Sequence, residues 1–282
     1  MQGKVVVITG GSSGIGQVAA ERLAAMGARI VLVARSKNRG EATLGRLREV
    51  APGQKHSVHY GDVSLLADLN RLAAEIKAAQ PRIDVLINNA GAMFGRRQVT
   101  KDGLELTFAT NHMSYFVLTL GLHEPLAAAG AARIVNTSSA AHNRAKIDFD
   151  DLQSERNYKG FPVYSRSKLC NILFTRVLAR QLAGTGITAN SLHPGFVKTR
   201  FGDESGGGMA RMIGLMKIFA ISQEKGAETI VYLASSADVA KTSGLYFYKC
   251  KPVEPSKAAQ DDTAAERLWQ ATEKLAHFST RP

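Results

Sequence analysis

Tyr164 and Lys168 are the residues whose types and spacing most directly suggest chemistry. They lie four positions apart in the run VYSRSKLCN, so on a helix they share one face and can point into one cleft. A phenol can donate a proton to a reacting oxygen or remove one from it, and a nearby ammonium can stabilise the charge that develops. Upstream, TGGSSGIG at 9–16 is a glycine-rich strand-to-helix turn. Together the two motifs predict nicotinamide-dependent redox chemistry, which neither predicts alone.

The turn at 9–16 has the residues that a phosphate-binding loop needs. Glycines let the backbone approach a phosphate closely, and the first N–H groups of the following helix offer donors and a partial positive charge. We expect cofactor contacts from Gly10, Ser12, Ser13, Gly14, Ile15 and Gly16. A tight turn alone also demands glycine, so this interpretation needs support from the next strand.

The end of the second expected strand carries basic residues where an NAD-binding chain usually has an acid for the ribose hydroxyls. The chain reads ARSKNR at 34–39, and no carboxylate follows the strand before Glu41. A guanidinium can hold a 2′-phosphate through forked, charge-assisted hydrogen bonds. Arg35 therefore predicts that NADP(H) is preferred, with NAD(H) as the second option. The alternative is a solvated surface arginine.

These motifs must be positioned by the elements around them, and short apolar runs alternate with amphipathic segments along the chain. We expect strands at VVVIT, RIVLVA, HSVHYG and DVLINN, each followed by a helix, at 15–26, 38–49, 65–79 and 102–122. Next come RIVNTS, a helix beginning near Tyr164, ITANSLHPG, a helix at about 223–235 and a last strand at LYFY. The alternation predicts an α/β fold, a single-domain Rossmann-type doubly wound parallel sheet with helices on both faces and ligands at the strand ends.

The composition is that of an ordinary globular chain of 282 residues, 45% hydrophobic and 21% charged, which favours one domain over 1–282. Cys170 and Cys250 lie far apart, which argues against a disulfide framework or a zinc site and favours a reducing, cytoplasmic location. We expect no signal peptide and no stable membrane anchor, because the apolar stretch at about 209–221 is short and interrupted by charges. The net charge of +12 is scattered, so we expect small anionic ligands and no nucleic acid.

In this order the motifs resemble those of the classical short-chain dehydrogenase/reductase family over nearly the whole chain. TGGSSGIG is similar to the family's TGxxxGxG turn, and HPGFVKT resembles the segment that holds the nicotinamide carboxamide. The resemblance implies a catalytic set of Asn111, Ser139, Tyr164 and Lys168. It implies further cofactor contacts at Asp62, Val63, Asn88, Ala90, Gly91, Tyr164, Lys168, Pro194, Gly195, Val197 and Thr199. Ser138 is the alternative serine, disfavoured because the motif places the catalytic serine second.

Within the family, the chain looks most like the retinol-dehydrogenase-like branch, which favours NADP(H), on the runs IVNTSSAAH, SKLCNILFTRVLARQL and QEKGAETIVYLA. Ser139 and Tyr164 are 25 positions apart, farther than in compact bacterial members. We therefore expect an extra segment at about 142–161 beside the active site, with substrate contacts in it. The N-terminal anchor helix of membrane-bound vertebrate members is not expected, which weighs against retinoid specificity.

The implied catalytic set is sufficient to reduce a carbonyl or oxidise an alcohol. Tyr164 would be the general acid/base, although a free phenol has a pKa near 10. Bringing that pKa to about 7 favours the phenolate by roughly 4 kcal/mol, which Lys168 and the charge of the oxidised nicotinamide could supply together. Ser139 would hydrogen-bond the substrate oxygen, and Asn111 would hold a water that links Lys168 to solvent. No metal is expected. Three histidines are given no catalytic role, His112, His142 and His193.

The segment at about 200–221 is rich in glycine and methionine, and we expect it to form a flexible apolar lid over a small hydrophobic alcohol or carbonyl substrate. An ordinary surface helix or a membrane-surface contact is the alternative. The resemblance suggests a homodimer or homotetramer built on the helices beginning near 102 and 164, whose apolar stripes could equally be buried in the monomer. The rival to an oxidoreductase is a non-catalytic NADP(H)-binding sensor or scaffold, which the intact catalytic set disfavours.

Overall fold

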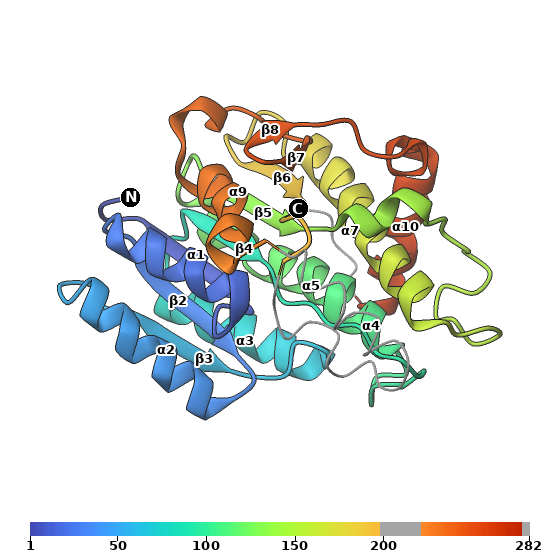
Figure 1. Cartoon of the computed structure of the whole chain (residues 1–282), viewed down its shortest axis with the longest axis horizontal. Coiled ribbons are helices and arrows are strands. Elements are labelled where there is room, and N and C mark those ends of the chain that lie inside the picture. Colours follow the sequence, from blue (N-terminus) through green and yellow to red (C-terminus); the bar gives the residue numbers. More distant parts are fainter. Residues whose placement is uncertain (198–220, 278–282) are drawn as a thin grey trace.

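The computed structural model describes residues 1–197 and 221–277, and Figure 1 shows their arrangement. These residues form a sheet of eight strands in the order β3-β2-β1-β4-β5-β6-β7-β8. The strands are β1 (Val5–Thr9), β2 (Arg29–Ala34), β3 (Ser57–Tyr60), β4 (Val85–Asn88), β5 (Arg133–Thr137), β6 (Thr188–Leu192), β7 (Tyr246–Tyr248) and β8 (Lys251–Pro252). Neighbouring strands from β3 to β7 pair in parallel, whereas β7 and β8 pair antiparallel. The predicted doubly wound parallel sheet is confirmed.

Helices cover both faces of the sheet because its strands are apolar on both sides. In β1, Val6 and Ile8 face one layer and Val7 faces the other. The first layer contains α1 (Gly14–Ala25), α2 (Lys37–Val50) and α9 (Gln223–Ser235). The second contains α3 (Leu66–Ala79), α5 (Ser114–Gly121) and α7 (Gly160–Gln181), with α10 (Asp262–Leu275) against α7. Shorter helical turns are α6 (His123–Ala127), η2 (Ala140–Arg144), η5 (Ala237–Val239) and η6 (Lys257–Gln260).

The prediction of one continuous helix over 102–122 is wrong in two respects. The helix begins later, as α4 (Leu106–Phe108), because the Thr100 hydroxyl accepts a hydrogen bond from the backbone N–H of Asp102 and holds a turn there. It then widens into a π-helical turn, η1 (Ala109–Met113), before α5 continues it. Single π-helical turns are frequent at functional sites, and this one contains Asn111, a member of the expected catalytic set. The helix expected near Tyr164 also begins about one turn earlier than predicted, because α7 begins at Gly160.

The prediction also missed the last three elements of the described residues, which are β8, the short helix η6 and the helix α10. The buried Trp269 of α10 packs on Phe116 of α5, with 4.9 Å between ring centroids, and on Phe174 of α7, with 5.7 Å. The Asp261 side chain caps α10 by accepting a hydrogen bond from the N–H of Ala264. The apolar stripes of these helices were expected either to form an oligomer interface or to be buried in the monomer. Phe116 and Phe174 are buried within one chain.

Asp84 is a buried carboxylate just before β4, and it connects the amino ends of the central strands. Its oxygens accept hydrogen bonds from Lys4 Nζ at 2.9 Å, Arg82 Nη2 at 2.6 Å and the backbone N–H of Val5 at 2.9 Å. Burial alone raises the pKa of Asp84, but these partners outweigh it, so the pKa lies below its ordinary value of 3.8. The ionised carboxylate therefore stabilises the native state.

We expect Asp84→Asn to lower the free energy of unfolding by about 2 kcal/mol at neutral pH, because Lys4 and Arg82 lose a charged acceptor. A depressed native pKa means that this contribution is present above the unfolded value of 3.8 and is lost as the pH falls through the native value. The gap in free energy of unfolding between the parent and Asp84→Asn should therefore narrow as the pH falls. Urea unfolding of both proteins over a descending pH series measures it, and a gap independent of pH would contradict the ionic role.

Candidate active site

The candidate catalytic residues and the glycine-rich turn meet at one edge of the sheet. The turn follows β1, the run NNAG follows β4, Ser139 follows β5 and the run HPGFV follows β6. Because these strands are parallel and adjacent, their carboxyl ends lie at the same edge. The strand order reverses between β1 and β4, and ligands of doubly wound sheets bind at such a reversal.

The glycine-rich turn is shaped so closely that side chains do not fit at its glycine positions. Gly10 and Gly14 have φ of 66° and 58°, a region that side chains rarely adopt. A Cβ atom added to Gly16 would lie 2.4 Å from both the carbonyl oxygen of Gly10 and the Nδ2 of Asn89. The side chain of Ser13, at the N-cap of α1, accepts no hydrogen bond from that helix. A close turn before a helix whose first N–H groups lack a side-chain cap fits a dinucleotide diphosphate.

The carboxyl end of β2 keeps the basic character seen in the sequence. Arg35 is exposed between β2 and α2, and Ser36 caps α2 by accepting the N–H of Arg39 at 3.4 Å. The carboxylate of Glu41 accepts a hydrogen bond of 2.6 Å from the Tyr60 hydroxyl, so one of its oxygens is engaged by β3. Arg35 therefore lies at the carboxyl end of β2, and the carboxylate of Glu41 in α2 is bound to Tyr60 of β3.

The adenine-side pair, Asp62 and Val63, lies in a loop held by local hydrogen bonds. Asp62 Oδ1 accepts from the backbone N–H of Ser64 at 2.9 Å and from its hydroxyl at 2.7 Å, while the Asp62 N–H donates to Asp68 Oδ2 at 2.7 Å. Val63 is partly buried against the core. The loop after β3 therefore has a fixed shape at the same edge of the sheet as the turn.

The two asparagines of the run NNAG bind different parts of the molecule, which the sequence did not indicate. The side chain of Asn88 is buried and donates to Thr119 and Asn136, so it braces the core, and its contact with a cofactor stays a prediction. Asn89, which was not predicted as a site residue, donates its Nδ2 to the carbonyl oxygens of Thr9 at 3.2 Å and Gly10 at 3.4 Å. Asn89 thus holds the glycine-rich turn, a role that no short run of the sequence signals.

Gly91, the last residue of that run, leaves room for Lys168. A Cβ atom on Gly91 would lie 3.2 Å from Lys168 Nζ. The neighbouring Ala90 is fixed by its N–H, which donates to the Thr9 hydroxyl at 3.1 Å. The backbone after β4 therefore passes directly beside Lys168, as a surface that a nicotinamide ribose could share.

Ser139, Tyr164 and Lys168 come together at this edge. Ser139 is the N-cap of η2, and its Oγ accepts the N–H of Ala141 at 3.2 Å, which leaves its hydroxyl proton free to donate. Ser139 and Tyr164 share a side-chain hydrogen bond. Lys168 Nζ lies 5.8 Å from the centre of the Tyr164 ring and donates to the carbonyl oxygen of Thr137 at 3.1 Å.

The alternative serine has a different role. Ser138 is buried, and its hydroxyl donates to the backbone carbonyl of Lys168 at 2.6 Å. That bond holds α7 against the end of β5. The geometry therefore favours Ser139 as the serine that faces the reacting groups.

Burial opposes the charged forms of both Tyr164 and Lys168. It raises the pKa of Tyr164 to about 12, although the hydrogen bond with Ser139 works in the other direction. It lowers the pKa of Lys168 to about 7. The expected phenol pKa near 7 required Lys168 and the charge of the oxidised nicotinamide together, so it stays a prediction. In the protein alone, the neutral phenol is the favoured form at neutral pH.

Asn111 lies in the π-helical turn η1, and its side chain binds other parts of the site. Its Nδ2 donates to the carbonyl oxygen of Ala92 and to the hydroxyl of Ser167, both at 2.9 Å, and its Oδ1 accepts the N–H of Ala92 at 2.7 Å. The side chain therefore fastens the loop after NNAG to α7. Its role in holding a water that leads to Lys168 stays a prediction.

The segment after β6 reaches the same edge. Gly195 has a φ of 89°, and its N–H donates to His193 Nδ1 at 3.2 Å. Pro194 lies between these two residues, and Val197 forms an isolated bridge with Ile221. Thr199 and the predicted lid, apart from Ile221, lie outside the described residues.

The extra segment at 142–161 forms a fixed wall beside α7. The Tyr158 hydroxyl donates to the carbonyl oxygen of Phe94 at 2.9 Å, and Gln153 Oε1 accepts the N–H of Glu105 at 2.7 Å. Phe161, the last residue of this segment, is 49% exposed, and its ring centre lies 6.4 Å from that of Tyr164. This aromatic surface beside the phenol was not predicted, and substrate contacts from the segment stay a prediction.

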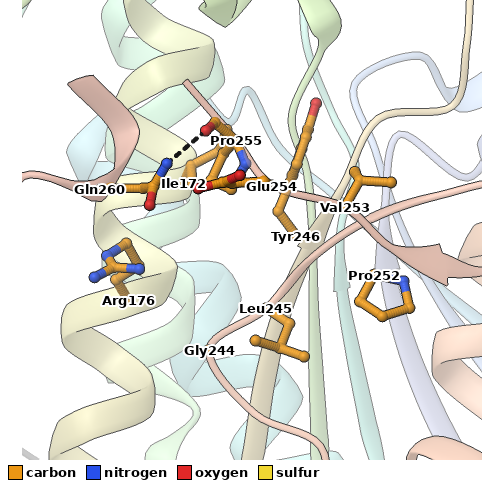
Figure 2. A pocket seen from close by; sticks show the side chains of 10 residues that line it. All are labelled: Ile172, Arg176, Gly244, Leu245, Tyr246, Pro252, Val253, Glu254, Pro255 and Gln260. Carbon is orange, nitrogen blue, oxygen red and sulfur yellow. Dashed lines mark hydrogen bonds between the residues drawn. The ribbon is translucent and has the colours of Figure 1, made fainter. Parts of the chain in front are cut away.

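A cavity of about 340 Å³ lies between α7 and the β7–β8 edge of the sheet, and Figure 2 shows the side chains around it. Ile172 and Arg176 line it from α7, and Tyr246 and the segment 252–255 line it from the other side. Neither Ser139 nor Tyr164 nor Lys168 lines this cavity, so it is not the reaction centre.

The described residues contain no group of three or more histidine, cysteine, aspartate or glutamate side chains arranged to hold a metal ion. Over the same residues, we find no helix with the length and apolar character needed to cross a membrane.

Comparison with known proteins agrees with this geometry. The family model for short chain dehydrogenases matches residues 4–208. Mouse retinol dehydrogenase 14 is 40% identical over 288 residues, covering 98% of this chain and 86% of the relative. Human retinol dehydrogenase 13 is 38% identical over 279 residues, covering 97% and 84%.

Solved structures show the same fold. An uncharacterised protein from Mycobacterium paratuberculosis superposes with a TM-score of 0.81 at 32% identity, covering 100% of this chain and 96% of that one. RhlG of Pseudomonas aeruginosa, solved as an active-site complex with NADP, superposes with a TM-score of 0.70 at 26% identity, covering 88% and 94%. The chain therefore belongs to the short-chain dehydrogenase/reductase family and resembles its retinol-dehydrogenase-like branch.

Proposed function

We propose that this protein is an NADP(H)-dependent oxidoreductase that interconverts a hydrophobic alcohol and its aldehyde or ketone. The observation that carries the proposal is the meeting of Ser139, Tyr164 and Lys168 at the sheet edge that also carries a turn with no room for side chains at its glycine positions. A sensor or scaffold that only bound the dinucleotide would need the turn but not a serine hydroxyl aimed at a buried phenol.

The roles of the residues follow from their contacts. When bound, NADP(H) supplies or accepts the hydride. In reduction, the neutral phenol of Tyr164 donates its proton to the substrate oxygen. The raised pKa of Tyr164 keeps the phenol protonated until then. The hydroxyl of Ser139 donates a hydrogen bond to the same oxygen as negative charge develops there. Lys168, beside Gly91 and Thr137, stabilises the phenolate left behind and holds the nicotinamide ribose.

A hydrophobic substrate is supported by the surface next to Tyr164. Phe161 exposes about half of its surface there, and Phe196, in the segment after β6, is 44% exposed. Large apolar side chains left in water at the edge of a catalytic centre favour binding of an apolar ligand.

The proposal is tested by following absorbance at 340 nm with NADPH and then NADH against aliphatic, aromatic and retinoid-like aldehydes and ketones. Tight NADPH binding without turnover on any of them would favour the sensor.

We expect Arg35→Asp to change the ratio of NADPH to NADH affinity by about 30-fold in favour of NADH, equivalent to about 2 kcal/mol. The aspartate would repel a 2′-phosphate and could accept hydrogen bonds from ribose hydroxyls. Fluorescence titration with both cofactors measures the two dissociation constants. Arg48→Asp, the same charge change in the last turn of α2, is the control and should leave the ratio unchanged. An unchanged ratio in Arg35→Asp would make that residue a solvated surface arginine.

A further inference from the structure

We propose that His142 is a positioning residue for Ser139, and that it ties the catalytic serine to the backbone segment that follows β8. The proposal rests on the oxidoreductase function argued above. His142 lies in η2, three positions after Ser139, and is 1% exposed. No role was assigned to it from the sequence.

The His142 ring and backbone bind the same oxygen of the catalytic serine. The carbonyl oxygen of Ser139 accepts a hydrogen bond from the backbone N–H of His142 at 3.2 Å and lies 2.7 Å from its Nδ1. A carbonyl only accepts, so Nδ1 carries the proton of this pair. Ser139 Oγ is oriented by the first turn of η2, where it accepts the N–H of Ala141. Holding the carbonyl therefore holds the hydroxyl that faces Tyr164.

The other ring nitrogen makes the long-range bond. Nε2 of His142 accepts the backbone N–H of Ser256 at 3.2 Å, 114 positions along the chain. A backbone N–H only donates, so Nε2 is bare and the ring is neutral, which agrees with the lowering of the pKa of His142 by burial. Nδ1 therefore donates to the carbonyl of Ser139, and Nε2 accepts from the N–H of Ser256.

The segment that His142 binds is itself fixed to the sheet. The N–H of Val253 donates to the carbonyl oxygen of Tyr246 at 2.8 Å, and residues 252–255 form one wall of the cavity in Figure 2. The Tyr246 ring packs edge-on against the His142 ring, with 5.0 Å between centroids, and its hydroxyl lies 3.4 Å from Nδ1. The imidazole is therefore held from the β7–β8 edge, and Ser139 is held through it.

Two substitutions separate the two functions of the ring. The side-chain amide of His142→Asn can place an N–H near Nδ1 and keep the donor to Ser139, whereas that of His142→Gln can place an oxygen near Nε2 and keep the acceptor for Ser256. We expect His142→Gln to lower kcat about tenfold and His142→Asn to lower it no more than about threefold. The NADPH dissociation constant should stay unchanged in both, because Ser139 acts on the substrate oxygen. Equal kcat values in the two variants would overturn the proposal.

A double-mutant cycle tests whether His142 acts through Ser139. Single-turnover rates are measured for the parent, His142→Gln, Ser139→Ala and the double variant, with thermal unfolding and NADPH binding as checks of folding. We expect the tenfold effect of His142→Gln to fall below about twofold once the serine hydroxyl is absent. The same loss in both backgrounds would show a merely structural role. A parent without turnover would instead reject the proposed function, before any variant is compared.

Ser256→Pro gives an independent test if His142→Gln fails to fold. The φ of Ser256 is −56°, a value that proline adopts, so the change removes the N–H that His142 accepts and keeps the local backbone angle. We expect kcat to fall about twofold to threefold with no change in NADPH affinity, as in His142→Asn, which loses the same bond. An unchanged kcat would show that the bond to Ser256 does not position the serine.

Discussion

Tyr164→Phe is expected to lower kcat for carbonyl reduction by about a thousandfold, with little change in NADPH affinity. The substitution removes the group that gives a proton to the substrate oxygen and keeps the ring in its buried place. The hydrogen bond shared with Ser139 is lost as well, so the serine side chain keeps the N–H of Ala141 but loses the phenol. Hydride transfer would then leave an alkoxide that no side chain protonates, which is why the loss falls on kcat.

Stopped-flow absorbance at 340 nm and fluorescence titration with NADPH measure the two quantities separately. Tyr232→Phe is the matched control, because this partly buried tyrosine of α9 packs on the opposite layer of the sheet from α7. It should leave both kcat and NADPH affinity unchanged. If Tyr164→Phe turns over at the rate of the parent, the assignment of the general acid is wrong and another donor must reach the substrate.

The parts of the site that could be predicted are those encoded in short runs of sequence. TGGSSGIG follows an apolar strand and opens a helix, and Tyr164 and Lys168 share a face because a helix has a fixed period. The parallel sheet followed from the alternation of apolar strands with helices, and it places the strand ends at one edge. These inferences depend on neighbouring residues, so they could be made without coordinates.

The parts that could not be predicted depend on partners far away in the sequence. Asn89 matters because its side chain reaches Gly10, 79 positions away, and His142 because Nε2 reaches Ser256. The pKa of Tyr164 depends on burial, which a helical spacing does not specify. The π-helical turn that contains Asn111 has no short sequence signature, and α10 follows strands after which no further helix was expected.

The second large effect is expected from Gly16→Ala, which should weaken NADPH binding about 30-fold and lower the free energy of unfolding by about 2 kcal/mol. The new methyl group would lie 2.4 Å from the Gly10 carbonyl and from Asn89 Nδ2. The Gly10 contact is with backbone, so the turn itself must open. Opening it moves the first N–H groups of α1 away from the diphosphate that they are expected to bind.

Gly45→Ala is the control that separates this clash from the ordinary effect of alanine in a helix. Gly45 lies within α2, and a Cβ atom there would meet no atom within 4 Å. Alanine should therefore raise the free energy of unfolding by up to about 1 kcal/mol and leave NADPH affinity unchanged. Urea unfolding and fluorescence titration give both values for each variant. Because both glycines are helical, opposite signs of the two changes in free energy of unfolding would assign the loss at Gly16 to the closeness of the turn. If Gly16→Ala keeps the NADPH affinity of the parent, this turn is not part of the cofactor site.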